Sequence, residues 1–274
     1  MFKLVFFSLF SHLAIGGLLP LFFIALEEIG TMYFRLISLL AALFLGFALL
    51  AQPFTTAPPA VAPVPGFSPG LVLGLLAASI VMLVAGAIGI KFLRKSYLWP
   101  AFGAGVLALL ASAFFYPAVA GATPSAFTVK ALSFAGSAFL LGSVMTAMIT
   151  GHWYLVNHRL TIQPLKIASL LFLAAVILRL LFVTGLMSFN ALAGEAATVT
   201  VTRNLLSLSG EGLIFWARVA IGLVGPLIFG FMVHATVKLR STQSATGILY
   251  GAVVMVFIGE AFSKFLWFFT GIPV

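Results

Sequence analysis

The sequence contains no cysteine and no aspartate, and its five acidic residues are all glutamates. Without cysteine, the chain cannot form disulfides, bind metal through thiolates or hold an iron–sulfur cluster with sulfur ligands of its own. Only 7% of the 274 residues are charged, whereas soluble domains have roughly 25%. This scarcity of charge excludes an ordinary soluble protein.

The few charges that are present are mostly positive, which gives a formal net charge of +9. Such an excess is typical of nucleic-acid-binding proteins, but in so apolar a chain it indicates basic loops on one side of a membrane. The sequence also lacks a P-loop, an HExxH zinc motif and a dinucleotide-binding GxGxxG motif. We therefore expect the protein to associate with a lipid bilayer and not with nucleic acid.

Long apolar runs dominate the sequence: 63% of the residues are hydrophobic and the mean hydropathy is +1.25. Several runs reach about 20 residues, the length of a helix that spans the bilayer core. Hydrocarbon offers no hydrogen-bond partners, so these runs must be helical, and the alternating pattern of a membrane barrel is absent. The sequence predicts an all-α bundle with one transmembrane domain over residues 1–274. The eight predicted spans are residues 4–26, 31–51, 69–91, 98–118, 130–154, 164–188, 211–237 and 245–269.

Two connections between the spans are long. Residues 51–70 contain six prolines and no charge, a composition typical of an extended loop. Residues 188–212 are polar and β-branched in their middle, which predicts either a short hairpin or an interfacial helix.

The distribution of basic residues predicts the orientation in the membrane, because cytoplasmic loops are enriched in lysine and arginine. An arrangement with both termini on the outer, periplasmic side places three basic residues outside and eight inside, whereas the opposite arrangement reverses this bias. We expect the first arrangement, in a bacterial inner membrane. The outer residues are Lys3, Lys130 and Arg203, and the inner ones are Arg35, Lys91, Arg94, Lys95, Arg159, Lys166, Lys238 and Arg240.

Five ionisable residues fall inside predicted spans, where charge is costly and a functional role is the first hypothesis. They are His12, Arg179, Arg218, Glu260 and Lys264. Counted from the helix ends, all five lie in the outer half of the bilayer. We expect Glu260 to pair with Lys264 at i+4 or with an arginine from another helix. The alternative is that the basic side chains extend to the membrane surface, most readily Lys264.

Two of these residues share a pattern, His12-x3-Gly16-x3-Pro20 and Arg218-x3-Gly222-x3-Pro226. Each proline frees the carbonyl four residues before it, which belongs to the glycine, and should kink the helix. Kinked backbone at this depth is tolerated where it lines a cavity or packs against protein. The pattern predicts a pocket that opens toward the outer face; the alternative is simple helix packing through glycine.

The segment GHWYLVNHRL, residues 151–160, holds two of the four histidines. It lies at the inner end of the fifth predicted span. Six residues at about 100° each leave His152 and His158 on different faces of a helix, so we expect His158 in a loop. His152 is predicted to reach the depth of His234, the minimum geometry for two axial ligands of haem b.

Eight helices, outer termini and polar residues in the outer half of the bilayer resemble the quinone-interacting membrane-anchor subunits of the polysulfide-reductase and DMSO-reductase type. The resemblance is one of architecture over the whole chain and includes no shared motif. It implies a subunit of a hetero-oligomeric respiratory oxidoreductase that binds menaquinone or ubiquinone and passes electrons to an extramembrane iron–sulfur partner. On this hypothesis, His12, Arg179, Arg218 and Glu260 form the quinone pocket, since apolar cavities bind quinone carbonyls through such hydrogen-bonding and proton-carrying groups.

Three other functions remain open. A haem b cytochrome subunit would use His152 and His234 as ligands. A transporter for a small anion or a proton-coupled solute would use Arg179, Arg218 and Glu260. A purely structural anchor would bind soluble partners through residues 51–70 and 188–212.

Overall fold

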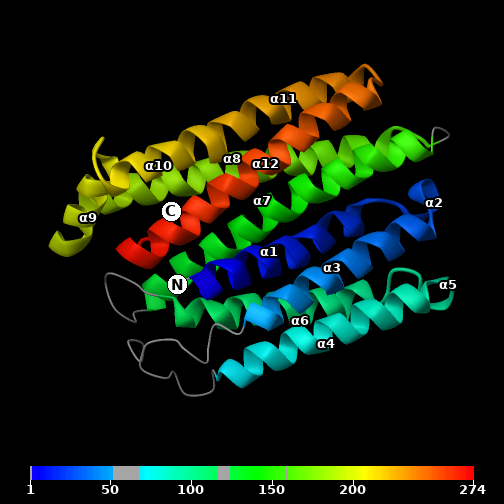
Figure 1. The fold of residues 1–274 in the computed structure, drawn as a ribbon, viewed down its shortest axis with the longest axis horizontal. Helices are drawn as coiled ribbons and strands as arrows, with labels where there is room; N and C mark the ends of the chain where they lie inside the picture. Colours follow the sequence, from blue (N-terminus) through cyan, green and yellow to red (C-terminus); the bar gives the residue numbers. More distant parts are fainter. Residues whose placement is uncertain (1, 52–67, 117–123, 158–159) are drawn as a thin grey trace.

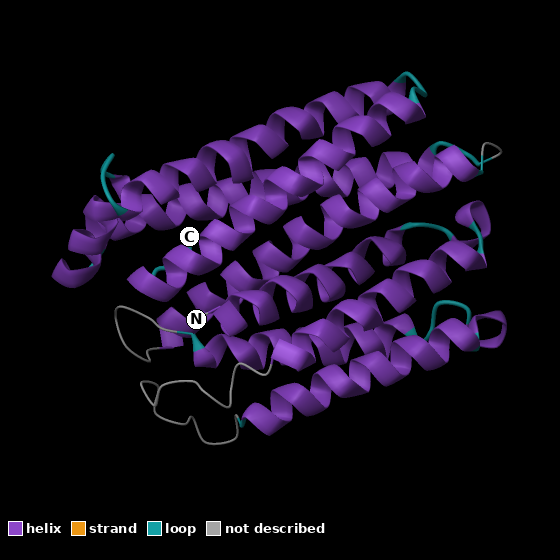
Figure 2. Ribbon diagram, in the orientation of Figure 1, coloured by secondary structure: helices purple, strands orange, loops and turns teal. Residues whose placement is uncertain are grey.

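The predicted apolar spans form long helices in the computed structural model, which describes residues 2–51, 68–116, 124–157 and 160–274. These residues contain helices and turns and no strand (Figure 2). Eight helical segments are long and apolar enough to cross a membrane, as predicted. They are α1 (Phe2–Phe23), α3 (Thr31–Ala51), α4 (Pro69–Ile88), α6 (Leu98–Ser112) with the 3-10 turn η2 (Ala113–Phe115), α7 (Pro124–Val156), α8 (Gln163–Ala193), α10 (Glu211–Val219) continued by η3 (Ala220–Val224) and α11 (Gly225–Lys238), and α12 (Thr242–Thr270).

Three short helices join these spans: α2 (Leu26–Ile29), α5 (Ile90–Leu93) and α9 (Ala196–Leu206). Within residues 188–212, α8 continues to Ala193 and α9 follows it, so the helix was the correct alternative and the hairpin was wrong. The β-branched residues of α9 lie in a helix and do not pair as strands; Thr202 among them is buried and Thr200 is exposed. In the proline-rich connection, residues 52–67 lie outside the described residues.

The helices run up and down beside one another, with α1 and α7 in the middle of the bundle (Figure 1). On one side lie α3, α4 and α6, and on the other α8, α10, α11 and α12. Both termini lie at the same end, and α2 and α5 lie at the opposite end. That the end of the bundle with both termini faces the outer side of the membrane stays a prediction.

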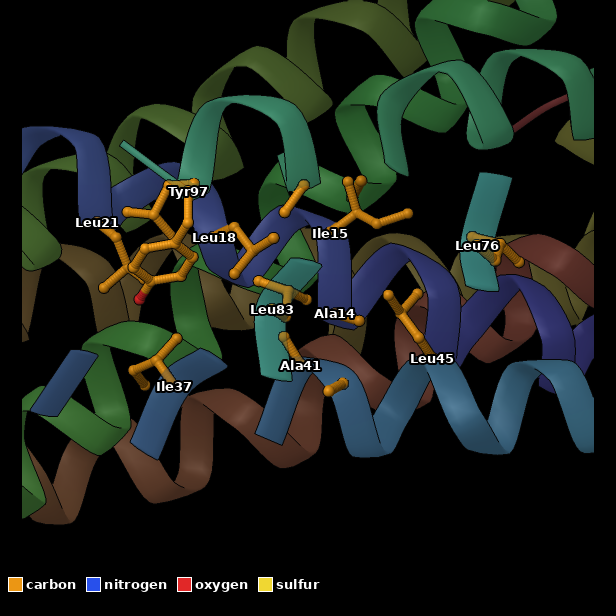
Figure 3. Packing of buried hydrophobic residues seen from close by; sticks show 14 of the residues in the cluster. Ala14, Ile15, Leu18, Leu21, Ile37, Ala41, Leu45, Leu76, Leu83 and Tyr97 are labelled. Carbon is orange, nitrogen blue, oxygen red and sulfur yellow. The ribbon is translucent and has the colours of Figure 1, made fainter. Parts of the chain in front are cut away.

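The two halves of the bundle have separate apolar cores. Figure 3 shows side chains of α1, α3 and α4, with Tyr97 from the start of α6, meeting in the first half. The Tyr97 hydroxyl lies 2.8 Å from Ser38 Oγ, so its polar end is satisfied inside this apolar core. The second core joins α7, α8, α11 and α12. A smaller apolar cluster, which includes Phe134 and Trp267, contacts Lys264, one of the charged residues described below.

Glycine allows the closest helix contacts. A Cβ at Gly142 of α7 would lie 1.9 Å from the carbonyl carbon of Gly16 in α1, and a Cβ at Gly259 of α12 would lie 2.2 Å from Cα of Gly222. Only glycine permits backbones to approach this closely. Gly16 in the His12 pattern and Gly222 in the Arg218 pattern therefore serve close helix packing.

The prolines of the two patterns act differently. Pro20 lies inside α1, which continues to Phe23. Before Pro226 the helix widens into a π-helical segment, η3, which begins two residues after Arg218. The wider turn accommodates the proline ring and the missing N–H.

Candidate functional site

Four of the five ionisable residues predicted inside the spans meet around one carboxylate. Glu260 of α12 accepts Arg179 Nε of α8 at 3.3 Å and Arg218 Nη2 of α10 at 3.5 Å on Oε1. Lys264 Nζ, one helical turn further along α12, lies 3.9 Å from Oε2. All four side chains are at most 2% exposed. The predicted pairing of Glu260 is therefore confirmed, with both arginines and the i+4 lysine together.

Ser137 of α7 is the hydroxyl that connects this ion cluster, defined here as Arg179, Arg218, Glu260 and Lys264. Its Oγ donates to Glu260 Oε2 and accepts from Lys264 Nζ at 2.8 Å and from Arg179 Nη2 at 3.2 Å. One donor and two acceptor lone pairs are all that a hydroxyl offers, so Ser137 is saturated. This contact attaches α7 to both α8 and α12.

Arg179 is fully engaged by its neighbours. Nη1 donates to the carbonyl oxygen and Oγ of Ser133 at 3.3 and 3.1 Å. Nη2 also donates to Ser263 Oγ and to the carbonyl oxygen of Val274, both at 3.3 Å. The guanidinium holds four chain segments together, and this matches its complete burial.

Lys264 points inward, so the alternative in which it extends to the membrane surface is wrong. Its side chain is 0% exposed. Nζ lies 5.0 Å from the centroid of the Phe134 ring and 5.6 Å from that of Trp267. Two aromatic rings, a serine hydroxyl and a glutamate carboxylate thus surround the Lys264 ammonium. They take the place of the water that would solvate it at the membrane surface.

Arg218 is incompletely paired. Nη2 reaches Glu260, but Nε and Nη1 are buried and have no hydrogen-bond partner among the described residues. Unpaired donors of a buried guanidinium are costly and uncommon. Around Glu260 the cluster has three positive charges against one negative charge.

His12 lies beside the cluster without joining it. The ring is 0% exposed and packs edge-on against Phe134, with centroids 4.6 Å apart. Neither ring nitrogen has a partner in the described part of the chain. Phe134 contacts both His12 and Lys264, so the aromatic ring links the histidine to the ion cluster.

An apolar groove of about 530 Å³ lies between α1, α6, α7 and α8. Arg179 is the one polar residue along it, while His12, Arg218 and Glu260 do not line it. The predicted common pocket of these four residues is therefore divided into a groove that reaches Arg179 and a packed cluster behind it. Its apolar walls include Ile15, Leu19, Phe102, Val106, Phe139 and Phe182.

The histidines proposed as haem ligands lie on α7 and α11, which each pack on α8 and α12. His152 is exposed, and its Nδ1 lies 3.0 Å from the Tyr250 hydroxyl of α12. His234 is half-buried near the end of α11. Haem binding by this pair stays a prediction, and His158 lies outside the described residues.

The sequence interpretation missed the serines of this site. Ser133 and Ser137 are spaced i, i+4 and therefore share a face of α7, and Ser263 precedes Lys264 on α12. A pair of hydroxyls one turn apart in a span was the available signal, because buried charges need such partners.

No family model matches this chain, and no curated protein matches it at a significant level of similarity.

Proposed function

We propose that this integral membrane protein is a quinone-binding subunit of an electron-transfer complex, with the quinone or quinol held in the groove between α1, α6, α7 and α8. One observation carries the proposal: the groove is apolar along its length except where it meets Arg179. A quinone likewise combines a long apolar part, its isoprenoid tail, with a small polar part, its ring carbonyls. Ligand sites of this kind are mostly apolar with few orienting polar groups.

Arg179 is the residue that would orient the ring. Arg179 lines the groove, and its guanidinium is held in one position beside the groove by Glu260, Ser133 and Ser137. Gly136 forms the adjoining wall, where a Cβ would lie 3.6 Å from Arg179 Cδ.

His12 is the candidate for proton transfer. Three cations surround Glu260, so its carboxylate is used in ion pairing. His12 has two unpartnered ring nitrogens and lies one turn from Ile15 and Gly16, which line the groove. A bound quinone would supply proton-coupled redox chemistry.

A redox partner is part of this proposal. The chain has no cysteine for an iron–sulfur cluster, so any such cluster that exchanges electrons with the quinone belongs to another subunit. The proposed complex therefore combines this membrane anchor with an extramembrane redox protein.

A groove-filling variant tests the proposal. Ala135 lines the groove, and we expect Ala135→Phe to weaken binding of decylubiquinone or a short-chain menaquinone to the protein in nanodiscs at least tenfold. Ala235→Phe is the matched control, because Ala235 is exposed on α11 away from the groove. Equal quinone affinity in the two variants would rule out the groove as the site.

A further inference from the structure

We propose that the ion cluster binds a small inorganic anion, such as a halide or nitrate, at the unpaired nitrogens of Arg218. Three cationic side chains share one glutamate carboxylate in the cluster, so positive side-chain charge exceeds negative side-chain charge there. Each of these side chains is at most 2% exposed. Charge buried in this way is normally compensated by an opposite charge or by complete hydrogen bonding.

The chain offers no further carboxylate side chain for this role. Two acidic residues fall within the eight spans of the described residues, Glu260 and Glu211, and Glu211 is the first residue of its span. Glu27 and Glu28 lie in α2, Glu195 precedes α9, and Glu211 begins α10, about two turns before Arg218. Since the sequence has five acids, no second acidic side chain belongs to the cluster.

The hydrogen bonds locate the site within the cluster. Arg179 and Lys264 are engaged by serine hydroxyls, a main-chain oxygen and aromatic rings. Within the cluster, Arg218 alone keeps two buried nitrogens, Nε and Nη1, that have no partner among the described residues. An anion accepted by these nitrogens would satisfy them and offset the excess charge at the same time.

The helix beside Arg218 also departs from regular geometry. The π-helical segment η3 begins two residues later, and Gly222 within it contacts Gly259 of α12. Such single-turn widenings occur often at functional sites. This feature distinguishes the Arg218 side of the cluster from the Arg179 side, which faces the quinone groove.

The first test uses chloride as the probe and the full chain in lipid nanodiscs. We expect the thermal unfolding midpoint to rise in a saturable manner when chloride replaces gluconate at constant ionic strength. Arg218→Met and Lys264→Met should raise the apparent chloride dissociation constant at least tenfold. Glu260→Gln should lower it, because that variant removes the one negative charge. Arg203→Met, on the exposed face of α9, is the matched control and should leave it unchanged.

The second test needs no variant. Anomalous scattering from crystals grown in bromide should show a peak within hydrogen-bond distance of the Arg218 guanidinium. A midpoint that does not depend on the anion, or an Arg218 site occupied by water alone in bromide, would overturn the proposal. The quinone proposal is tested separately, because the Ala135→Phe variant should keep the full chloride response.

Discussion

At the scale of single residues, Glu260 is the centre of the site. Arg179, Arg218 and Lys264 come from three separate helical segments, and each one is within 4 Å of this carboxylate. Removing one partner from a buried ion pair is more damaging than replacing the whole pair, because the remaining charge is left without compensation. The stability of the second half of the bundle therefore depends on this one acid.

Glu260→Gln should lower the free energy of unfolding by about 3–5 kcal/mol. The amide keeps a partner for Ser137 but removes the only negative charge facing three cations. Reversible unfolding in mixed detergent micelles measures the effect. Glu195→Gln is the control, since Glu195 is exposed at the start of α9 and should change stability little. Equal stability of the two variants would contradict the central role of Glu260.

Ser137→Ala should lower the free energy of unfolding by about 1–3 kcal/mol, because Glu260, Arg179 and Lys264 each lose a hydrogen-bond partner in a buried site. The same unfolding measurement applies. Ser143→Ala is the matched control on α7: Ser143 is also buried but donates only to the carbonyl oxygen of Leu140, at 3.2 Å. A larger loss in Ser143→Ala than in Ser137→Ala would disprove the connecting role.

At the scale of helices, close contacts at glycine determine which spans are neighbours. The α1–α7 crossing depends on Gly16 and Gly142, and the contact between η3 and α12 depends on Gly222 and Gly259. Lipid provides no hydrophobic driving force between apolar helices, so small residues and polar contacts select the partners. Both crossings lie within about one turn of His12 or Arg218, and they hold these side chains in the interior.

Gly142→Ala should destabilise the protein by about 1–3 kcal/mol through overpacking. The added Cβ would overlap the backbone of Gly16, which no rotamer change relieves. Gly185→Ala on α8 is the control, since nothing lies within 4 Å of a Cβ there, and its helix propensity should improve by up to about 1 kcal/mol. Thermal unfolding in nanodiscs should therefore shift in opposite directions, and a common direction would contradict this account of the crossing.

At the scale of the whole molecule, basic residues gather at the end that carries α2 and α5. Arg94 pairs there with Glu27, which ties α5 to α2, and Lys166, Lys238 and Arg240 belong to the same end by the topology of the chain. Arg159, which the sequence also predicts at the inner end, lies outside the described residues. The basic end is expected to face the cytoplasm.

Cysteine labelling tests this orientation directly, because the chain has no cysteine of its own. Ser209→Cys places a thiol at the end of the termini and Ser96→Cys places one at the basic end, both at exposed positions. In intact bacterial cells, a membrane-impermeant maleimide should label Ser209→Cys alone, and permeabilised cells should show both. The reverse pattern would show that the termini are cytoplasmic.

The sequence alone determined the class of the protein, because the number and length of its apolar runs leave helices as the only solution in a bilayer. It also identified four charged residues that had to be paired. The tertiary structure decided how: it placed Ser137 and Ser133 among the charges, turned Lys264 inward and separated His12 and Arg218 from the groove at Arg179. The physical reason is that span length and burial depend on hydropathy along one helix, whereas a charge network depends on which faces of several helices meet, and no periodicity within one span specifies that.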